Sequence, residues 1–190
     1  MEELVGLYRA VDEAFTQVKD SFSDEVRCGQ GCDDCCHAVF DVSVVEALGV
    51  LAVFKDLDDE IRSQILENGA TAESLWGKLN VDPAADLARA RIRCPLLNDA
   101  GLCLCYEARP VNCRSYGIPT FINGAGHVCG FSGFEKGIDY PTINLEQVQD
   151  GLLEMSIKLA GEEDGRHRWS LAAVLLDPGT VIGLMKNSQK

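Results

Sequence analysis

The stretch Cys28-Gly-Gln-Gly-Cys32-Asp-Asp-Cys35-Cys36-His37 decides what kind of fold this chain builds, because it places four cysteines within nine residues. Spacings of two or three residues let a chain wrap one metal ion with successive thiolates. The two glycines can adopt the positive φ angles that a tight wrap requires, and backbone amides of the same turn can stabilise the charge of the sulfurs. Side chains of adjacent residues diverge, so Cys35 and Cys36 suit either two different metals or one ligand and one buried thiol.

A second cysteine segment follows, with thiols at Cys94, Cys103, Cys105 and Cys113. Residues 98–101, Asn-Asp-Ala-Gly, have turn composition, so Cys94 and Cys103 are expected to face each other across a loop or short hairpin. In an extended strand, Cys103 and Cys105 would share one face. Pro95 and Pro110 interrupt any helix here. The segment is therefore expected to be an irregular loop of the kind that metal binding organises.

The composition indicates a globular protein without a nucleic-acid or membrane partner. The chain has 190 residues, of which 46% are hydrophobic and 25% charged, a size and balance typical of one soluble domain. Its net charge of −13 excludes the basic footprint of nucleic-acid binding and a polybasic membrane anchor. The longest apolar run, residues 47–54, is much shorter than the roughly 20 residues that span a bilayer. The first residues lack a secretory-signal pattern, so the expected location is cytoplasmic.

The chain contains nine cysteines in all, because Cys129 follows the two segments. In a reducing cytosol, clustered cysteines indicate metal binding or catalysis rather than disulfides, and an odd number fits a fully paired disulfide framework poorly. The candidate metal ligands are Cys28, Cys32, Cys35, Cys36, Cys94, Cys103, Cys105, Cys113 and Cys129.

The order of these motifs resembles the YkgJ-type cysteine-cluster family, which is described as a zinc- or iron-chelating domain. The resemblance covers residues 25–130 and rests on the first cysteine knot followed by Cys94-Pro-Leu-Leu, Gly101-x-Cys103, Tyr106-x2-Arg109-Pro110 and Cys113-Arg114. It implies metal coordination by cysteines in a small bacterial protein. The cysteines on the family pattern are Cys28, Cys32, Cys35, Cys36, Cys94, Cys103 and Cys113. Cys105 stands where an apolar residue is expected, and Cys129 matches a downstream cysteine.

The rest of the chain is expected to be helical. Apolar residues recur at three- and four-residue spacing over residues 2–22, and Ser43 with Glu46 forms a capping-box pattern. Further helices are expected over residues 43–54, 58–69, 71–79, 83–92, 144–159 and 166–176. The predicted fold is mostly α, with helices surrounding irregular cysteine-rich loops and room for one short hairpin. We expect a single cysteine-cluster metal-binding domain over residues 1–190, with its core motifs within residues 28–129.

Several other residues allow two interpretations. His37 and His127 can ligate a metal through imidazole, although a histidine such as His37 more often caps a loop or faces solvent; His167 is expected at the surface. Asp33 and Asp34 are most simply solvated loop residues.

The arginines also allow two interpretations. Arg93, Arg109 and Arg114 can offset the negative charge of thiolates without competing as ligands. Alternatively, Arg109 forms a structural bridge to Glu46 or Glu107.

Three functions remain open from the sequence. The first is a metal-binding protein that chelates zinc, the first choice, or iron through a polynuclear thiolate site shared by both segments. The second is an iron–sulfur protein in electron transfer or oxidoreduction, although the spacing departs from the ferredoxin run. The third is a metal-dependent enzyme, which the scarcity of histidine disfavours. No catalytic residue or protein partner is indicated.

Overall fold

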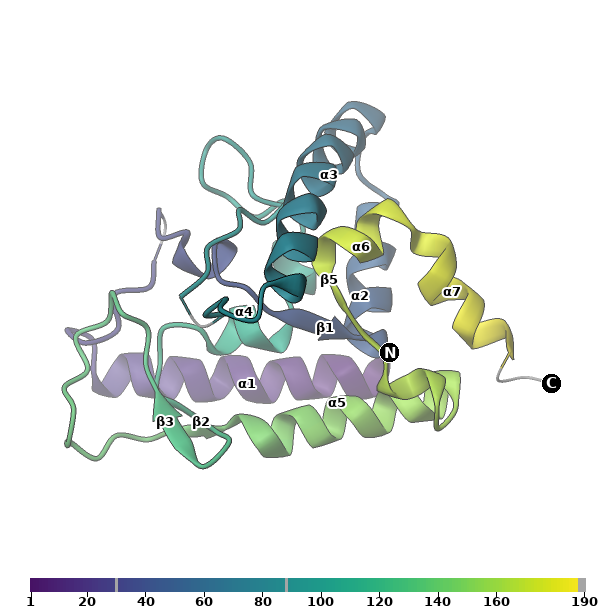
Figure 1. Ribbon diagram of the computed structural model, residues 1–190. Helices are drawn as coiled ribbons and strands as arrows, with labels where there is room; N and C mark the ends of the chain where they lie inside the picture. The colour runs from purple at the N-terminus through teal and green to yellow at the C-terminus, as the bar shows by residue number, and fades with distance from the viewer. Residues whose placement is uncertain (30, 88, 188–190) are drawn as a thin grey trace.

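The computed structural model describes residues 1–29, 31–87 and 89–187, and it is built mainly from α-helices joined by irregular segments (Figure 1). The expected mostly α fold is confirmed, with the cysteines in or beside loops. The helices are α1 (Glu2–Ser21), α2 (Val44–Phe54), α3 (Asp59–Val81), α4 (Val111–Ser115), α5 (Leu145–Ala160), α6 (Leu171–Leu176) and α7 (Pro178–Asn187). The single 3-10 turns are η1 (Asp34–Cys36), η2 (Tyr106–Ala108) and η3 (Asp164–Arg166). The strands are β1 (Asp41–Ser43), β2 (Thr120–Ile122), β3 (Ala125–His127), β4 (Ile143–Asn144) and β5 (Arg168–Ser170).

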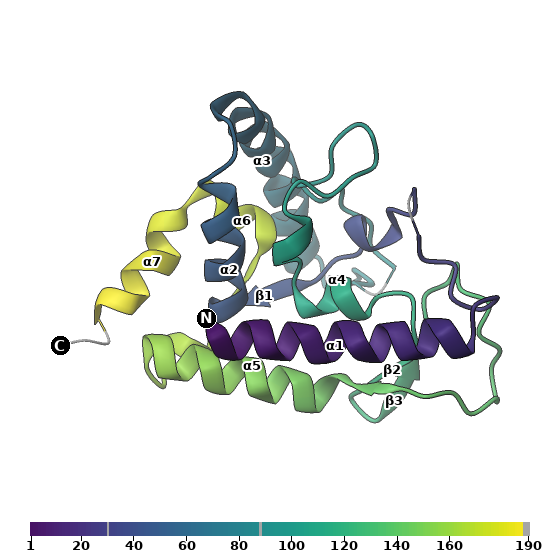
Figure 2. The same ribbon diagram turned by 180° about the vertical axis from the view of Figure 1, so that it is seen from behind.

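Helices α1 and α5 run antiparallel, side by side, along one edge of the molecule (Figures 1 and 2). Both agree with the helices expected over residues 2–22 and 144–159. Their apolar faces, which include Leu4 and Leu152, share one buried cluster with Val45 of α2 and Val111 of α4. The cysteine-rich segments therefore lie on a frame made from both halves of the chain.

Helix α2 occupies the centre of the fold and is apolar on nearly all sides, as a helix surrounded by protein must be. Its expected capping box is confirmed, because Ser43 and Glu46 bond each other's backbone and side-chain groups reciprocally. The box fixes the point at which β1 turns into α2.

Helix α3 is continuous, so the expected break at residues 68–69 is wrong. Gly69 lies inside the helix and is buried. A Cβ placed on Gly69 would lie 3.6 Å from Leu176 Cγ and 3.9 Å from Pro95 Cβ. The glycine therefore marks the place where α6 packs against α3, and this tertiary contact outweighs the weak helix propensity of glycine.

The expected helix over residues 83–92 does not form in the described part of that segment. The Asp82 carboxylate accepts the amide of Ala84 at 2.9 Å, and a local turn of this kind competes with helix formation. The helix expected over residues 166–176 begins only at Leu171, because residues 168–170 form β5 and pair antiparallel with β1. A further helix, α7, follows directly from Pro178, which is a favourable residue for a first helical turn.

The hairpin of the molecule lies downstream of the expected one. Strands β2 and β3 pair across Asn123 and Gly124, whose φ angles of 53° and 73° suit a tight turn. The expected turn over residues 98–101 does form, but its flanks meet only in an isolated bridge between Leu97 and Cys103. Within the described part of the chain, no helix is both long and apolar enough to cross a bilayer.

Candidate metal centre

The two cysteine segments lie against each other as a short antiparallel pair. The amide of Cys94 donates to the carbonyl of Cys36 at 2.6 Å, and the amide of Ile92 donates to the carbonyl of His37 at 3.0 Å. A bridge between Ala38 and Arg91 continues the pairing. Residues far apart in sequence thus hold the two sets of thiols in one region.

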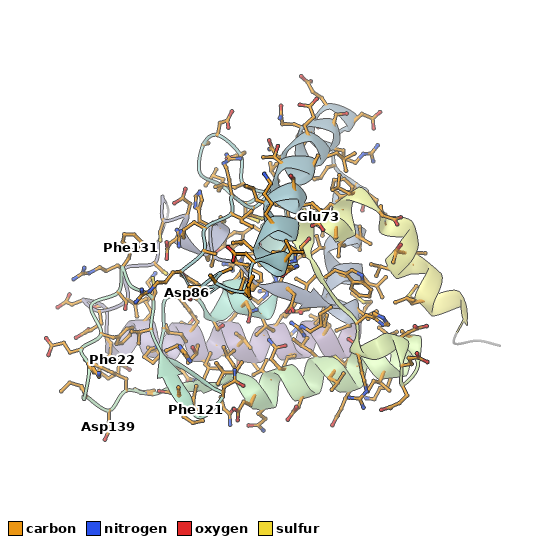
Figure 3. All side chains as sticks on the ribbon, in the orientation of Figure 1. Phe22, Glu73, Asp86, Phe121, Phe131 and Asp139 are labelled. Atoms are coloured by element: carbon orange, nitrogen blue, oxygen red, sulfur yellow. The ribbon has the colours of Figure 1, made fainter. Side chains whose placement is uncertain are left out.

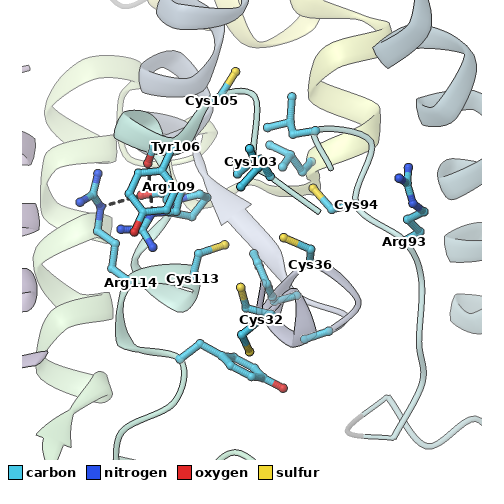
Figure 4. A pocket seen from close by; sticks show the side chains of 18 of the residues that line it. Cys32, Cys36, Arg93, Cys94, Cys103, Cys105, Tyr106, Arg109, Cys113 and Arg114 are labelled. Atoms are coloured by element: carbon cyan, nitrogen blue, oxygen red, sulfur yellow. Dashed lines mark hydrogen bonds between the residues drawn. The ribbon is translucent and has the colours of Figure 1, made fainter. Parts of the chain in front are cut away.

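These thiols line one cleft of about 780 Å³ (Figure 4). Eight of the nine cysteines contribute to its walls, namely Cys28, Cys32, Cys35, Cys36, Cys94, Cys103, Cys105 and Cys113. The ninth, Cys129, is buried and directs its thiol at Asp34, with Sγ 3.5 Å from Oδ2. All nine are free thiols.

Seven of the thiols fall into two groups, according to which neighbouring cysteines act on the pKa values of Cys28, Cys36 and Cys113. We call Cys28, Cys32 and Cys129 the outer thiols and Cys36, Cys94, Cys103 and Cys113 the inner thiols. Burial, followed by the charges of Cys32, Cys129 and Cys35, raises the pKa of Cys28 to about 12. Burial, followed by the charges of Cys35, Cys94 and Cys103, raises the pKa of Cys113 well above its ordinary range.

Cys35 lies between these groups and has neighbours in both. A hydrogen bond with Cys36 lowers the pKa of Cys35 to about 7 despite its burial, and the same bond raises the pKa of Cys36. The adjacent thiols therefore interact directly, and the sulfur of Cys36 points toward that of Cys113 (Figure 4).

The arginines divide into one that faces the sulfurs and others that serve the framework. Arg109 stacks on Tyr106, with its guanidinium carbon 3.6 Å from the ring centroid, and its charge counteracts the upward effect of burial on the pKa values of Cys35 and Cys103, although burial still leaves the pKa of Cys103 raised. Its Nε donates to the Tyr106 carbonyl. Among the described residues it forms no ion pair with Glu46 or Glu107, so the expected structural bridge is wrong.

Arg114, also expected to offset thiolate charge, instead fastens α4 to α1. Its guanidinium is 6% exposed, pairs with the Asp12 carboxylate at 2.5 Å and donates from Nε to the Arg109 carbonyl at 2.8 Å. Arg93 donates to the carbonyl of Asn98 at the rim of the second segment.

Asp34 corrects another expectation, because it is buried rather than solvated. Its carboxylate accepts the Tyr116 hydroxyl at 2.8 Å and pairs with Arg91. Burial alone would raise the pKa of Asp34, but the bonds from Tyr116 and Arg91 outweigh it and leave that pKa below its usual value. Asp34 thereby connects η1 to Arg91 and Tyr116, which flank the second cysteine segment, and to Cys129. No local signal pointed to this role, since its partners are 57 and 82 residues away.

Cys105 is placed differently from the other thiols that line the cleft. It is 1% exposed and packs in the main hydrophobic core, and its sulfur points away from those of Cys36 and Cys113 (Figure 4). The expected shared face with Cys103 is wrong, because a turn and η2 replace an extended strand there.

None of the three histidines is directed at the inner thiols in the contacts that the described residues make. A ring nitrogen of His37 lies 3.1 Å from the carbonyl of Asp33, which agrees with a loop-capping role. His127 is exposed on β3, and His167 stacks on Trp169 at 5.7 Å.

The chemistry of the donor set fits zinc or iron. Thiolates are soft ligands that these metals accept, and the fold collects them from two segments into one cleft. Among the described residues, no three Cys, His, Asp or Glu side chains stand in position to hold one ion together. A closed site therefore requires rotation of thiols about their side-chain bonds.

Comparison with known proteins gives one match. A family model described as a "putative zinc- or iron-chelating domain", CxxCxxCC, matches residues 27–130. No curated protein and no solved structure matches the chain.

Proposed function

The chain belongs to the CxxCxxCC family, and from this premise we propose that it binds zinc or iron through thiolates from both cysteine segments. The observation that carries the proposal is the pairing of Cys94 with Cys36, which puts inner thiols of both segments in one cleft. Because α1, α3, β5 and α6 all contribute residues to the walls of this cleft, we propose that residues 1–190 act as one metal-binding domain.

We further propose two neighbouring metal positions that share Cys35. The outer thiols supply one position and the inner thiols supply the other, while Cys35 has neighbours in both groups. With Cys35, the three outer thiols complete one four-coordinate ion, the number of ligands that zinc favours, while the four inner thiols suffice for the second ion and Cys35 lies near enough to bridge the two. Cys105 stays a core residue in this arrangement.

The proposed ions would leave excess negative charge on eight thiolates, and Arg109 is placed to reduce it. Its positive charge acts on Cys35, Cys103 and Cys113, and a guanidinium offsets thiolate charge without ligating. The chain's own contribution is thus to gather the sulfurs, keep them partly shielded from water and offset their charge.

An iron–sulfur cluster is the second candidate. The four inner thiols equal the number of cysteines that hold one cubane cluster, and the cleft between them and the outer thiols is larger than an ion needs. This alternative implies electron transfer or oxidoreduction rather than storage or structural binding.

Metal analysis of anaerobically purified protein, read with its visible absorption spectrum, tests the proposal and separates the candidates. We expect a colourless protein with zinc bound. Visible absorption together with equal iron and sulfide would favour the cluster instead. If the purified protein contains no metal and binds none when zinc or iron is added back, both candidate functions are contradicted.

A further inference from the structure

We propose that the same cleft also binds an uncharged, planar apolar molecule beside the thiols. One part of the cleft contains no cysteine and is lined by apolar side chains, and we call it the apolar wall. It consists of Val39, Phe40, Trp76, Ile92 and Leu171.

The size of the cleft exceeds what metal binding alone requires. Zinc reaches its sulfurs at about 2.3 Å, so even two neighbouring ions fill a small part of 780 Å³. Cavities of about 300–1,000 Å³ are typical of sites for small organic molecules. Leu102 and Tyr106 at the rim are about half exposed, so the cleft opens to solvent.

The apolar wall is accessible yet firmly supported. Trp76 lies one turn beyond Ala72 on the buried face of α3, and it remains only partly buried. Beside it, Ser170 bonds the Glu73 carboxylate and caps α6 through the amide of Ala173 at 2.9 Å. Glu73 lies where α3 meets the end of β5 (Figure 3). These bonds hold Leu171 opposite α3 whether or not the thiols carry metal.

The charges around the apolar wall favour an uncharged ligand over an anion. The apolar wall contains no ionisable side chain, and the chain carries −13 overall. Four cations among the described residues line other parts of the cleft: Arg109 is stacked on Tyr106, Arg114 pairs with Asp12, Arg93 donates to the Asn98 carbonyl, and Lys19 lies on α1, so none of them belongs to the apolar wall. An anion is therefore disfavoured, whereas the faces of Phe40 and Trp76 suit an uncharged ring system.

A matched pair of dyes tests both the wall and the charge. N-phenyl-1-naphthylamine is uncharged, and 8-anilinonaphthalene-1-sulfonate is closely similar but carries a sulfonate. We expect the uncharged dye to bind saturably to metal-loaded protein, and the sulfonate to bind at least about tenfold more weakly, a difference of about 1.4 kcal/mol. Equal or tighter binding of the sulfonate would overturn the charge argument, and no saturable binding of the uncharged dye would overturn the site.

Variants locate the dye. Trp76→Ala should weaken binding about tenfold, whereas Leu75→Ala, on the same helix but exposed and outside the cleft, should not. Equal effects of the two substitutions would overturn the location. If Trp76→Ala fails to fold, Trp169→Phe leaves Trp76 as the sole tryptophan, and its emission should be transferred to the bound dye. Absence of that transfer would also overturn the location.

The proposal is separable from metal binding. Dye binding is measured on protein prepared with and without metal, and the apolar wall predicts binding in both. Protein that binds the dye but no metal would contradict the proposed function alone, while protein that binds metal but no dye would contradict this inference alone.

Discussion

The carboxylate of Glu46 accepts the backbone amide of Val111 at 2.9 Å, and so joins the start of α2 to the start of α4. The same side chain accepts the Ser43 amide at 3.0 Å and the Ser43 hydroxyl at 2.8 Å, and it is 2% exposed. Because α4 carries Cys113, one buried carboxylate links the centre of the core to the inner thiols.

Glu46→Gln should destabilise the protein by about 1–3 kcal/mol, because an amide replaces an acceptor that receives three donors and leaves a buried group unsatisfied. Chemical denaturation measures this change. Glu154→Gln, at an exposed position on α5, is the matched control and should change stability by less than about 0.5 kcal/mol. Equal effects would mean that the buried link contributes nothing.

Gly69→Ala should stabilise the protein by about 0.5–1 kcal/mol, because alanine is the better helix former and its Cβ would meet Leu176 only at ordinary contact distance, 3.6 Å. Gly165→Ala should do the opposite, since its Cβ would lie 2.6 Å from the backbone of Ile157. Denaturation midpoints of both variants check the pair. Destabilisation by Gly69→Ala would show that α6 tolerates no extra atom there.

Local signals in the sequence predicted local structure well. The Ser43 and Glu46 capping box was readable because its members are three residues apart, and the repeating apolar residues of α1 and α5 identified both helices. The break expected at Gly69 failed because a distant contact with α6, not the helix itself, explains that glycine.

The sequence predicted the metal site only in part, because several of its contacts join residues that are distant in sequence. Clustering indicated the thiols, but the burial of Asp34 depends on Arg91 and Tyr116, which reach it only through the fold. Arg109 and Arg114 have the same chemistry in sequence, and tertiary position alone directs one to the sulfurs and the other to Asp12.

Metal binding should release protons and tighten as pH rises. Burial raises the pKa values of Cys28 and Cys94 from 9.0 to about 12, so these thiols are protonated at neutral pH and must lose a proton to ligate. Calorimetric titration in buffers of different ionisation enthalpy measures the protons released. Affinity that is unchanged between pH 6 and pH 8 would contradict thiol ligation.

The raised thiol pKa values also predict alkaline instability of metal-free protein. In the unfolded chain these thiols ionise near pH 9.0, whereas the folded chain keeps them protonated toward pH 12. The folded state therefore holds more protons in that interval, and the free energy of unfolding should fall as pH rises through it. Denaturation of chelator-treated protein at successive pH values measures the slope, and a flat profile would contradict the burial of the thiols.

Removal of metal should lower the melting temperature by more than about 10 °C, because structural metal sites contribute on the order of 10 kcal/mol. The segment from Cys94 to Cys113 contains little regular structure apart from η2 and α4, so we expect its order to depend on the metal. Calorimetry before and after chelation, followed by restoration with zinc, makes the measurement. A melting temperature that does not change on chelation would contradict a structural role for the metal.

Metal content of three proteins tests the central claim most directly, namely that both cysteine segments hold the metal together. We predict about two ions per chain in the wild type, about two in Cys105→Ala, and about one in Cys94→Ser, because the inner position loses a ligand while the outer position keeps all of its thiols. Retention of two full ions by Cys94→Ser would contradict the claim, since it would show that Cys36 of the first segment binds its ion without the second segment.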